Sequence, residues 1–520
     1  MLEEERKYEV DPRFAVPDLS DCLPDGGQVV AREPKYLRAT YYDTADLRLA
    51  RNGASLRFRR GDELPWTVKL PTDTPGIRNE ISRAGAPGTV PGELIALVLA
   101  YTRGALLEPG AVVRTTRRVH ELRDAYGRPL AELDDDTVSV LDGKTVRHRF
   151  REIEVERHEG GRKLLDRVDA RLREAGATVG DFLPKHVRAL CVLNSTAGIG
   201  VDALGPPEPT PPAPDLPRKA SAGEVVVQAL RADIGRIFDH DPLVRLRAPL
   251  PHGDTAVHQM RVGCRRLRSD LRTFRPLLAS AWVDGLRAEL AWLAQALGLA
   301  RDAEVLRARL RETAAADPLA PLDEPAIARI DAELSARHED ALTGLDDVLR
   351  SDRYRSLLER LVAAAAAAPL QSSRSALPAR DLLPRLVSRP WSRLAYGNDG
   401  ITGASDLDPV APDAQWHEVR VRAKRARYAI EAVADVLGGA AQELGRAVAA
   451  VQDLLGEHQD AAIAAETWLS IARDDPDDHT LAVTAGRLQE RERAVVREMR
   501  ERFPAAWREA SRRRLVDWLP

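Results

Sequence analysis

The sequence predicts an α+β multidomain protein, in which a strand-rich N-terminal domain precedes an all-helical C-terminal domain. Three observations lead to this prediction. Up to about residue 190, short runs of alternating polar and apolar residues are separated by Gly, Pro and Asp, which is the pattern of β-strands. Residues 204–217 are so rich in proline that they cannot sustain a helix or a central strand. After them, Ala, Leu and Arg dominate with a helical period to the end of the sequence.

We therefore expect one domain at residues 1–200, a semi-rigid linker at 201–220 and a second domain at 221–520. The three cysteines lie far apart, without the spacing of a zinc site or a disulfide framework, which fits a reducing compartment. No run approaches the ~20 apolar residues of a membrane span, and the acidic N-terminus is unlike a targeting signal. A cytoplasmic protein with no membrane partner is expected.

In the first domain, seven runs have the character of strands, and the first of them carries charge on both faces. Alternation places Glu3, Glu5 and Lys7 on one side of this run, although a frayed acidic N-terminus would have the same composition. The seven predicted strands are 3–10, 54–60, 65–70, 77–82, 113–122, 129–134 and 147–156.

The last predicted strand shows the same charge pattern more strongly. Glu152, Glu154 and Glu156 share one face, where like charges at period two repel each other unless cations lie among them. Arg57 and Arg59 of an earlier run also share a face. Charge on the covered side of a sheet must be neutralised, which metal cations and an anionic ligand would do. The alternative is a barrel with internal salt bridges.

The helical domain contains an internal duplication. Segment 258–268 matches segment 417–427, which begins 159 residues later (417 against 258), and the pair Leu297-Gly298 matches Leu455-Gly456 at nearly the same offset. These two matches at nearly one offset predict two similar helical halves that face each other, at about residues 221–370 and 377–520.

The duplicated segments carry stripes of positive charge. His258, Arg261, Arg265, Arg268 and Arg272 recur at helical spacing on one face. A solvated face usually mixes both signs, whereas these stripes are almost wholly positive in a chain whose net charge is -3. The natural partner is a long polyanion, either nucleic acid or polyphosphate. Aromatic residues are scarce, at 5%, which favours a partner without bases.

This duplicated pattern resembles the CHAD family, named for its conserved histidines, over about residues 221–520. The resemblance implies two pseudo-symmetric helical halves whose basic face binds inorganic polyphosphate. The second copy departs from the first at Lys424 and Glu431, where the first has arginines. The polyphosphate-binding candidates that the resemblance implies are His258, Arg261, Arg265, Arg266, Arg268, Arg272, His417, Arg420, Lys424, Arg425 and Arg427.

The N-terminal domain resembles the CYTH family, also called triphosphate tunnel metalloenzymes, over about residues 1–195. The resemblance rests on the ordered motifs Glu3-x-Glu5-x-Lys7, Tyr42-Asp43-Thr44, Leu56-Arg57-x-Arg59, Val68-Lys69, Arg117, Leu133-Asp134, Glu152-x-Glu154 and Pro184-Lys185. It implies a closed antiparallel β-tunnel with flanking helices and with acids and bases directed inward.

By the same resemblance, three groups of residues have implied roles. The metal-binding set for Mg²⁺ or Mn²⁺ is Glu3, Glu5, Glu132, Asp134, Glu152 and Glu154. The triphosphate-binding set is Lys7, Arg57, Arg59, Lys69, Arg117 and Lys185. The catalytic set is Glu3, Glu5, Lys7, Glu152 and Glu154, and further candidates for the tunnel interior are Arg78, Glu80 and Arg118.

These residues suit metal-dependent hydrolysis of inorganic triphosphate. Carboxylate oxygens without Cys or His favour Mg²⁺ or Mn²⁺ over zinc, and clustered bases with one or two metals neutralise phosphate charge and activate water. The segment 134–136 superficially resembles a calcium loop but has Thr145 where that loop requires Glu. Motifs for a phosphate loop, a dinucleotide fold and a zinc protease are absent.

Two alternatives stay open. The same tunnel could belong to a class IV-type adenylate cyclase or a thiamine triphosphatase, since a fold does not determine its chemistry. The protein could also be a catalytically inactive scaffold that binds polyphosphate and associates with cytoplasmic polyphosphate granules.

Overall fold

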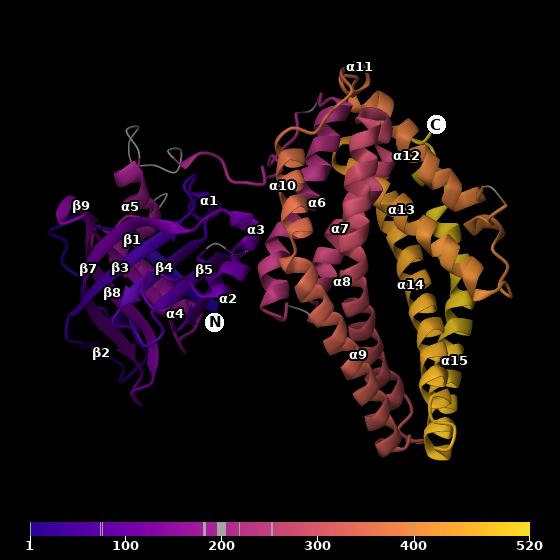
Figure 1. The fold of residues 1–520 in the computed structure, drawn as a ribbon, viewed down its shortest axis with the longest axis horizontal. Helices are drawn as coiled ribbons and strands as arrows, with labels where there is room; N and C mark the ends of the chain where they lie inside the picture. The colour runs from indigo at the N-terminus through magenta and orange to yellow at the C-terminus, as the bar shows by residue number, and fades with distance from the viewer. Residues whose placement is uncertain are drawn as a thin grey trace. The chain divides into compact units, whose positions relative to one another are not determined.

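The computed structural model describes residues 2–72, 74, 76–179, 184–194, 204–217, 219–250, 253–398 and 400–520. The chain divides into two compact units, Met1–Glu208 and Pro209–Pro520, and Figure 1 shows strands in the first and helices in the second. In the part of the chain that the structure describes, no helix is both long and apolar enough to cross a lipid bilayer.

The first unit contains a closed antiparallel barrel of eight strands. The barrel order is β7-β3-β4-β5-β6-β1-β9-β8, pairing of β8 with β7 closes it, and β2 adds to β7 beyond the end of β3. The strands are β1 (Leu2–Glu9), β2 (Gln28–Ala31), β3 (Lys35–Asp43), β4 (Ser55–Arg60), β5 (Trp66–Pro71), β6 (Ile77–Arg83), β7 (Glu108–Arg123), β8 (Pro129–Asp142) and β9 (Thr145–Arg157). The predicted closed tunnel with flanking helices is confirmed.

All seven predicted strands are present, but β2 and β3 were not predicted. Strand β3 begins exposed and ends buried, so its sequence does not alternate regularly. Strand β8 runs to Asp142 rather than to residue 134, because the acidic segment 134–136 stays in the ladder opposite β9.

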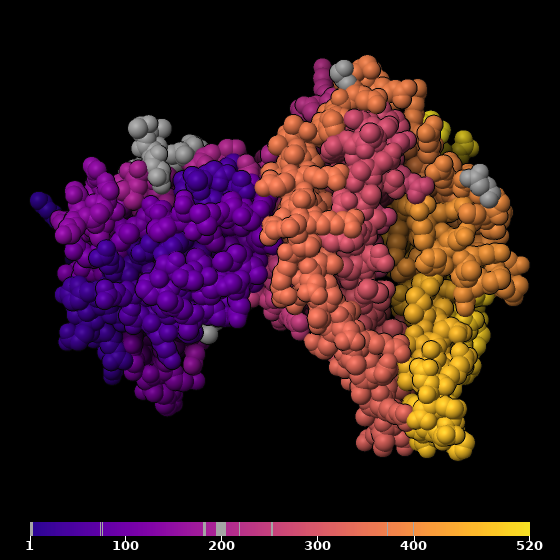
Figure 2. All heavy atoms as spheres, in the orientation of Figure 1, coloured from indigo at the N-terminus to yellow at the C-terminus, as the bar shows by residue number. Residues whose placement is uncertain are grey.

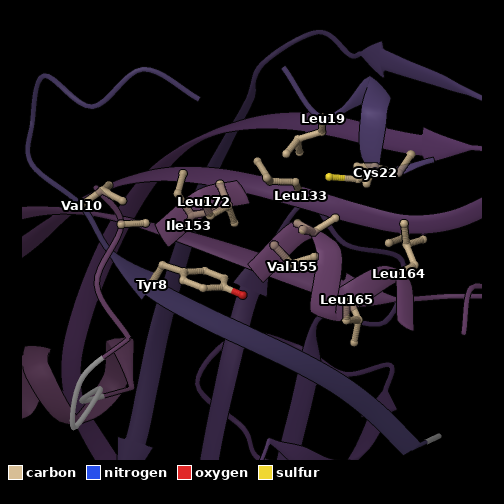
Figure 3. Packing of buried hydrophobic residues seen from close by; sticks show 14 residues of the cluster. Tyr8, Val10, Leu19, Cys22, Leu133, Ile153, Val155, Leu164, Leu165 and Leu172 are labelled. Atoms are coloured by element: carbon tan, nitrogen blue, oxygen red, sulfur yellow. The ribbon is translucent and has the colours of Figure 1, made fainter. Parts of the chain in front are cut away.

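One apolar core of this unit lies between the outer face of the barrel and helix α4. The helices of this unit are η1 (Ser20–Cys22), α1 (Arg48–Arg51), α2 (Gly92–Leu97), α3 (Leu99–Thr102), α4 (Arg162–Glu174) and α5 (Lys185–Asn194). Helix α4 buries Leu165 and Leu172 in the cluster that contains Tyr8, Ile153 and Val155 (Figure 3). Since side chains alternate along a strand, the outward position of these residues turns their charged neighbours toward the interior.

Helix α5 packs against the other face of the strands, the face that points into the barrel. Its Val187 and Leu190 contact a cluster that includes Val113, Val138 and Phe150, which share strand faces with the inward charges. The interior face is therefore apolar at this end of the barrel, and α5 covers it.

The second unit is wholly helical, which confirms the predicted class. Its helices are α6 (Ala222–Arg245), α7 (Ala256–Thr273), η4 (Arg275–Leu277), α8 (Ser280–Ala315), α9 (Glu324–Arg350), α10 (Asp352–Ala366), α11 (Ser372–Ser375), α12 (Ala379–Tyr396), η5 (Ala404–Asp406), α13 (Asp413–Leu437), α14 (Gly439–Arg473), α15 (His479–Ala510) and α16 (Arg513–Val516).

The internal duplication appears as a repeated order of helices. The duplicated basic segments lie in α7 and α13, and the long helices that follow them, α8 and α14, have 36 and 35 residues. Buried Met260, Leu267 and Leu271 form the apolar stripe of α7 opposite its charged stripe. On the face seen in Figure 2, a groove separates the rose atoms of α7 and α8 from the orange and yellow atoms of α13 to α15.

Candidate functional site

Strand register brings charged residues of three strands together inside the barrel. Lys7 of β1 lies opposite Glu154 of β9, and Glu154 in turn lies opposite Asp134 of β8. Asp136 and Glu152 form the next pair along β8 and β9. Because the residues that alternate with these are packed under α4, the carboxylates all point inward.

The interior contains a cavity of about 490 Å³. It brings together ten predicted site residues, which are Glu5, Lys7, Arg57, Arg59, Lys69, Arg117, Glu132, Asp134, Glu154 and Lys185, together with the further candidates Arg78 and Glu80. Glu152 lies deeper and is fully buried. Glu3 lies in β1, but its side chain is outside the described part of the chain. Arg118 is mostly exposed and pairs with Asp135 on the outer face.

Three buried carboxylates are arranged as a possible metal-binding set. One oxygen atom from each of Asp136, Glu152 and Glu154 lies within 4.8 Å of the other two. Neither oxygen of Glu152 accepts a hydrogen bond from any described residue, although Lys185 Nζ lies 3.1 Å from its Oε1. A buried carboxylate without hydrogen bonds is costly, and a divalent cation would satisfy it. The residues therefore fit a hard cation such as Mg²⁺ or Mn²⁺.

Two cations bridge these carboxylates. Lys185 Nζ lies 2.8 Å from Glu154 Oε2 and also contacts Asp136. Arg117 donates two hydrogen bonds to Asp136, of 2.8 and 2.7 Å, and a third to Glu154 of 3.1 Å. The first turn of α5 supplies Lys185, so this helix both covers the apolar end of the barrel and places a cation among the acids.

The carboxylates differ in their affinity for protons. Burial raises the pKa of Glu152 to about 7 and that of Asp134 to about 8. Burial would also raise the pKa of Glu154, but Lys185, Lys7 and Arg117 outweigh it and hold that pKa well below its usual range. The site thus contains a firmly ionised carboxylate beside two that take up protons near neutrality, and a bound cation would displace those protons.

Sequence reasoning missed Asp136 and His186 in this site. Asp136 had a usable signal, because it continues the period-two series of Glu132 and Asp134. His186 follows Lys185 and lines the cavity, where burial and the charges of Arg78 and Lys7 lower the pKa of its imidazole to about 3. It is therefore neutral, and no sequence pattern distinguished it from a core histidine.

The second unit carries a basic track, which we define as Arg261, Arg265 and Arg268 of α7 with Arg420 and Lys424 of α13. Burial and the charges of Arg420, Arg265 and Arg261 lower the pKa of Lys424 to about 7. Among the described residues, Nε of Arg265, Arg268 and Arg420 has no hydrogen-bond partner, although each of these atoms is buried. Buried donors without acceptors are costly, and the positive charges of the track repel each other. A bound anion would reduce both costs.

The other six predicted polyphosphate residues fall into three pairs. Arg266 donates to Glu431 at 2.6 Å, and Arg427 donates to the same carboxylate at 2.6 Å. Asp233 lies 3.3 Å from Arg266 and Asp453 lies 3.6 Å from Arg427, so carboxylates already pair with both arginines. His258 lies beside the track with its Nδ1 unpartnered among the described residues, whereas exposed His417 pairs with Gln459. The remaining two, Arg272 and Arg425, line a separate cavity of the same unit.

Comparison with known proteins divides the chain in the same way. The CYTH domain family matches residues 1–175, and the CHAD domain family matches residues 228–469. The Mycobacterium tuberculosis proteins MT2285 and Rv2226, both described as uncharacterized, are each 31% identical to this chain over 538 residues, covering 98% of it and 96% of each relative.

Two solved structures also resemble this chain. PptA from Streptomyces chartreusis shares 25% identity, with a TM-score of 0.45 over 56% of this chain and 100% of that one. The CHAD domain from Ricinus communis shares 22% identity, with a TM-score of 0.42 over 56% of this chain and 93% of that one.

Proposed function

This chain belongs to the family of proteins that join an N-terminal CYTH domain to a C-terminal CHAD domain, and on that premise we propose that it is a metal-dependent triphosphatase that also binds inorganic polyphosphate. CYTH domains are a family of triphosphate-hydrolysing tunnel enzymes. The observation that carries the proposal is the buried set Asp136, Glu152 and Glu154 beside clustered cations in one closed barrel.

The cations of the tunnel would bind the phosphate oxygens. Arg57, Arg59 and Lys69 come from adjacent strands β4 and β5 and line the cavity together. Arg57 Nε is buried without a partner among the described residues, so it is ready to donate to an oxygen. The guanidinium fork matches phosphate geometry, whereas Lys69 acts as a point charge.

The carboxylates would hold the cation. Asp136, Glu152 and Glu154 would bind Mg²⁺ or Mn²⁺, with Asp134, Glu132 and Glu5 at the same cavity. When bound, the metal would neutralise phosphate charge and activate the attacking water. Lys185 and Arg117, which bridge the carboxylates, would also keep them aligned and face the substrate.

The lining of the cavity favours an inorganic triphosphate as substrate. Of the described residues that line it, Leu64 and Pro184 are the only wholly apolar ones. A nucleobase or a thiamine ring would need a larger apolar or stacking surface. Hydrolysis of tripolyphosphate therefore fits this lining better than adenylate cyclase or thiamine triphosphatase activity does.

The test is phosphate release from tripolyphosphate with Mg²⁺ or Mn²⁺. We expect Glu152→Gln with Glu154→Gln to abolish the release, and Glu159→Gln, an exposed change outside the barrel, to leave it intact. Assays with ATP and thiamine triphosphate distinguish the alternative enzymes. If the folded protein with metal turned over none of these substrates yet bound polyphosphate, the result would support the hypothesis of a catalytically inactive scaffold.

Polyphosphate binding in the second unit rests on the clustered positive charge of the basic track and on the buried Nε atoms of Arg265, Arg268 and Arg420, which have no hydrogen-bond partner among the described residues. Linking this track to the tunnel would raise the effective concentration of polymer at the enzyme, where the geometry allows both to engage. We expect a cytoplasmic location in association with polyphosphate granules, with neither nucleic acid nor membrane as a partner. Fluorescence microscopy of the tagged protein beside stained granules tests this location.

A further inference from the structure

The second unit contains a cavity of about 890 Å³ that the duplicated motifs explain only in part. Its walls come from the C-terminal end of α7, η4, the start of α8, and helices α11, α12 and α13. Seven arginines line it, with Glu418 as the single carboxylate among the described lining residues. The arginines of this arginine cavity are Arg272, Arg275, Arg374, Arg389, Arg393, Arg422 and Arg425.

Several of these charges are not neutralised within the protein. Arg275 pairs with Asp284 at 2.7 Å, and Arg422 is buried and donates 2.9 Å to the backbone carbonyl of Arg393. By contrast, the guanidinium groups of Arg272, Arg389, Arg393 and Arg425 form no ion pair with any carboxylate in the described ranges. All four are exposed to the cavity side. Repulsion among them costs stability unless an anion with several charges offsets it.

The arginine cavity is electrostatically continuous with the basic track. Arg268 of the track and Arg272 of the cavity lie one helical turn apart on α7. The charge of Arg287 of α8 acts on Arg268 and on Arg425 of the cavity. The buried Nε of Arg287 has no hydrogen-bond partner among the described residues. Burial, together with Arg272, Arg287 and Arg393, lowers the pKa of Arg425 to about 10. Positive charge therefore extends from the track into the cavity, and Asp284 offsets only part of it.

We propose that the arginine cavity is a second binding segment for polyphosphate, so that a chain lying along the basic track continues past Arg287 and is held by Arg389 and Arg393 of α12. This inference deepens the proposed function and rests on it. Neither duplicated segment supplies α12, so these two arginines lie outside the stripes of α7 and α13. Arginine forks suit phosphate oxygens, and the absence of aromatic residues from the described lining fits a ligand without bases.

A single long polyanion explains the arrangement better than a separate small ion. One phosphate group would neutralise only part of a cavity with seven arginines, and it would leave Arg287 without an acceptor. A continuous chain supplies one charge for each successive guanidinium along the whole path. The affinity of the cavity should therefore depend on chain length.

The test compares two double variants of α12 that remove equal charge. Arg389→Gln with Arg393→Gln changes the cavity, whereas Arg380→Gln with Arg385→Gln changes exposed positions of the same helix that do not line it. Binding of long-chain polyphosphate and of tripolyphosphate to the full chain is measured over a series of salt concentrations, with thermal unfolding as the check on folding.

We expect the cavity variant to bind long-chain polyphosphate about 10- to 100-fold more weakly. The slope of log affinity against log salt should fall by about 1 to 2, and tripolyphosphate binding should change much less. The matched variant should behave like the unmodified chain.

Three results would overturn the inference in distinguishable ways. Equal binding by both double variants would remove the cavity from the site and leave the proposed function standing. An equal loss for tripolyphosphate and long chains would make the cavity a separate small-anion site. No polyphosphate binding by the unmodified chain would overturn the proposed binding function, and this inference with it.

Discussion

The guanidinium of Arg420 lies 3.5 Å from the carboxylate of Asp460, which repeats the 3.6 Å relationship of Arg261 and Asp302 in the first half. A Cβ atom at Gly298 would lie 3.4 Å from Arg261 Nε, and one at Gly456 would lie 4.0 Å from Arg420 Nε. In each half, the two duplicated segments therefore lie side by side. The Leu-Gly segment supplies the glycine and the aspartate that lie beside the arginine of the basic segment.

Removing these aspartates should strengthen polyphosphate binding. At 3.5 to 3.6 Å the carboxylates attract the arginines only weakly, yet they repel an incoming polyanion. We expect Asp302→Asn with Asp460→Asn to bind polyphosphate about 2- to 5-fold more tightly by equilibrium titration. Asp340→Asn with Asp347→Asn, two exposed changes on α9, is the matched control. Weaker binding would instead show that the aspartates orient the arginines.

Asp136 should be as important to the tunnel as the predicted glutamates. It belongs to the buried trio with Glu152 and Glu154, so Asp136→Asn should weaken Mg²⁺ or Mn²⁺ affinity at least about 10-fold and lower phosphate release accordingly. Metal titration of the activity measures this effect.

The neighbour of Asp136 supplies a control with the opposite expectation. Asp135 faces outward, where Arg151 donates to it at 2.7 and 2.9 Å. Asp135→Asn should lower the free energy of unfolding by about 1 to 3 kcal/mol and leave metal affinity nearly unchanged. If both variants lost metal affinity equally, the assignment of faces in β8 would be incorrect.

Metal binding in the tunnel should release protons. Because burial raises the pKa of Glu152 to about 7 and that of Asp134 to about 8, both must lose protons before they can bind a cation. Apparent metal affinity should therefore rise from about pH 6 to about pH 8 and level off above that. Calorimetry in buffers of different ionisation enthalpy counts the protons, and the count should fall in Glu152→Gln.

The same pKa shifts predict the stability of the protein when a chelator is present. The folded state holds protons on these carboxyls that the unfolded state loses at lower pH, so their contribution to stability declines as pH rises through about 7 to 8. Thermal unfolding with chelator should give a lower midpoint at about pH 8 than at about pH 6. Added metal should reverse this trend, and identical midpoints at both pH values would contradict it.

Polyphosphate binding should depend on pH through Lys424. The pKa of this half-buried ammonium is lowered to about 7, so it is charged below neutrality and largely neutral above it. We expect binding about 3- to 10-fold tighter near pH 6 than near pH 8, since one charged contact is gained. Lys424→Met should bind with the weaker affinity at both pH values, and Lys424→Arg should abolish the pH dependence at the tighter affinity.

Alternation in the sequence predicted which charged residues share a face of each strand. Spacing placed Lys7 with Glu5 on one strand and Glu152 with Glu154 on another, and the resemblance to the CYTH family implied that both faces point inward. The structure brings Lys7, Glu152 and Glu154 together inside the barrel. Asp136 was missed because three consecutive aspartates are typical of a turn and disfavoured in a strand. The segment remains in β8 because Arg117, Lys185 and Arg151, all distant in sequence, neutralise it.

The sequence by itself determined the class of each domain, the duplication and the signs of charge on each strand and helix face, since periodicity is a local property. It also determined the family through its ordered motifs. The tertiary structure alone decided which carboxylates share a buried site, which arginines are neutralised by Glu431, and that α12 contributes to a cavity with α7, α8 and α13. These features depend on contacts between segments far apart in the chain, where burial and Coulomb energy act through space and leave no periodic trace in the sequence.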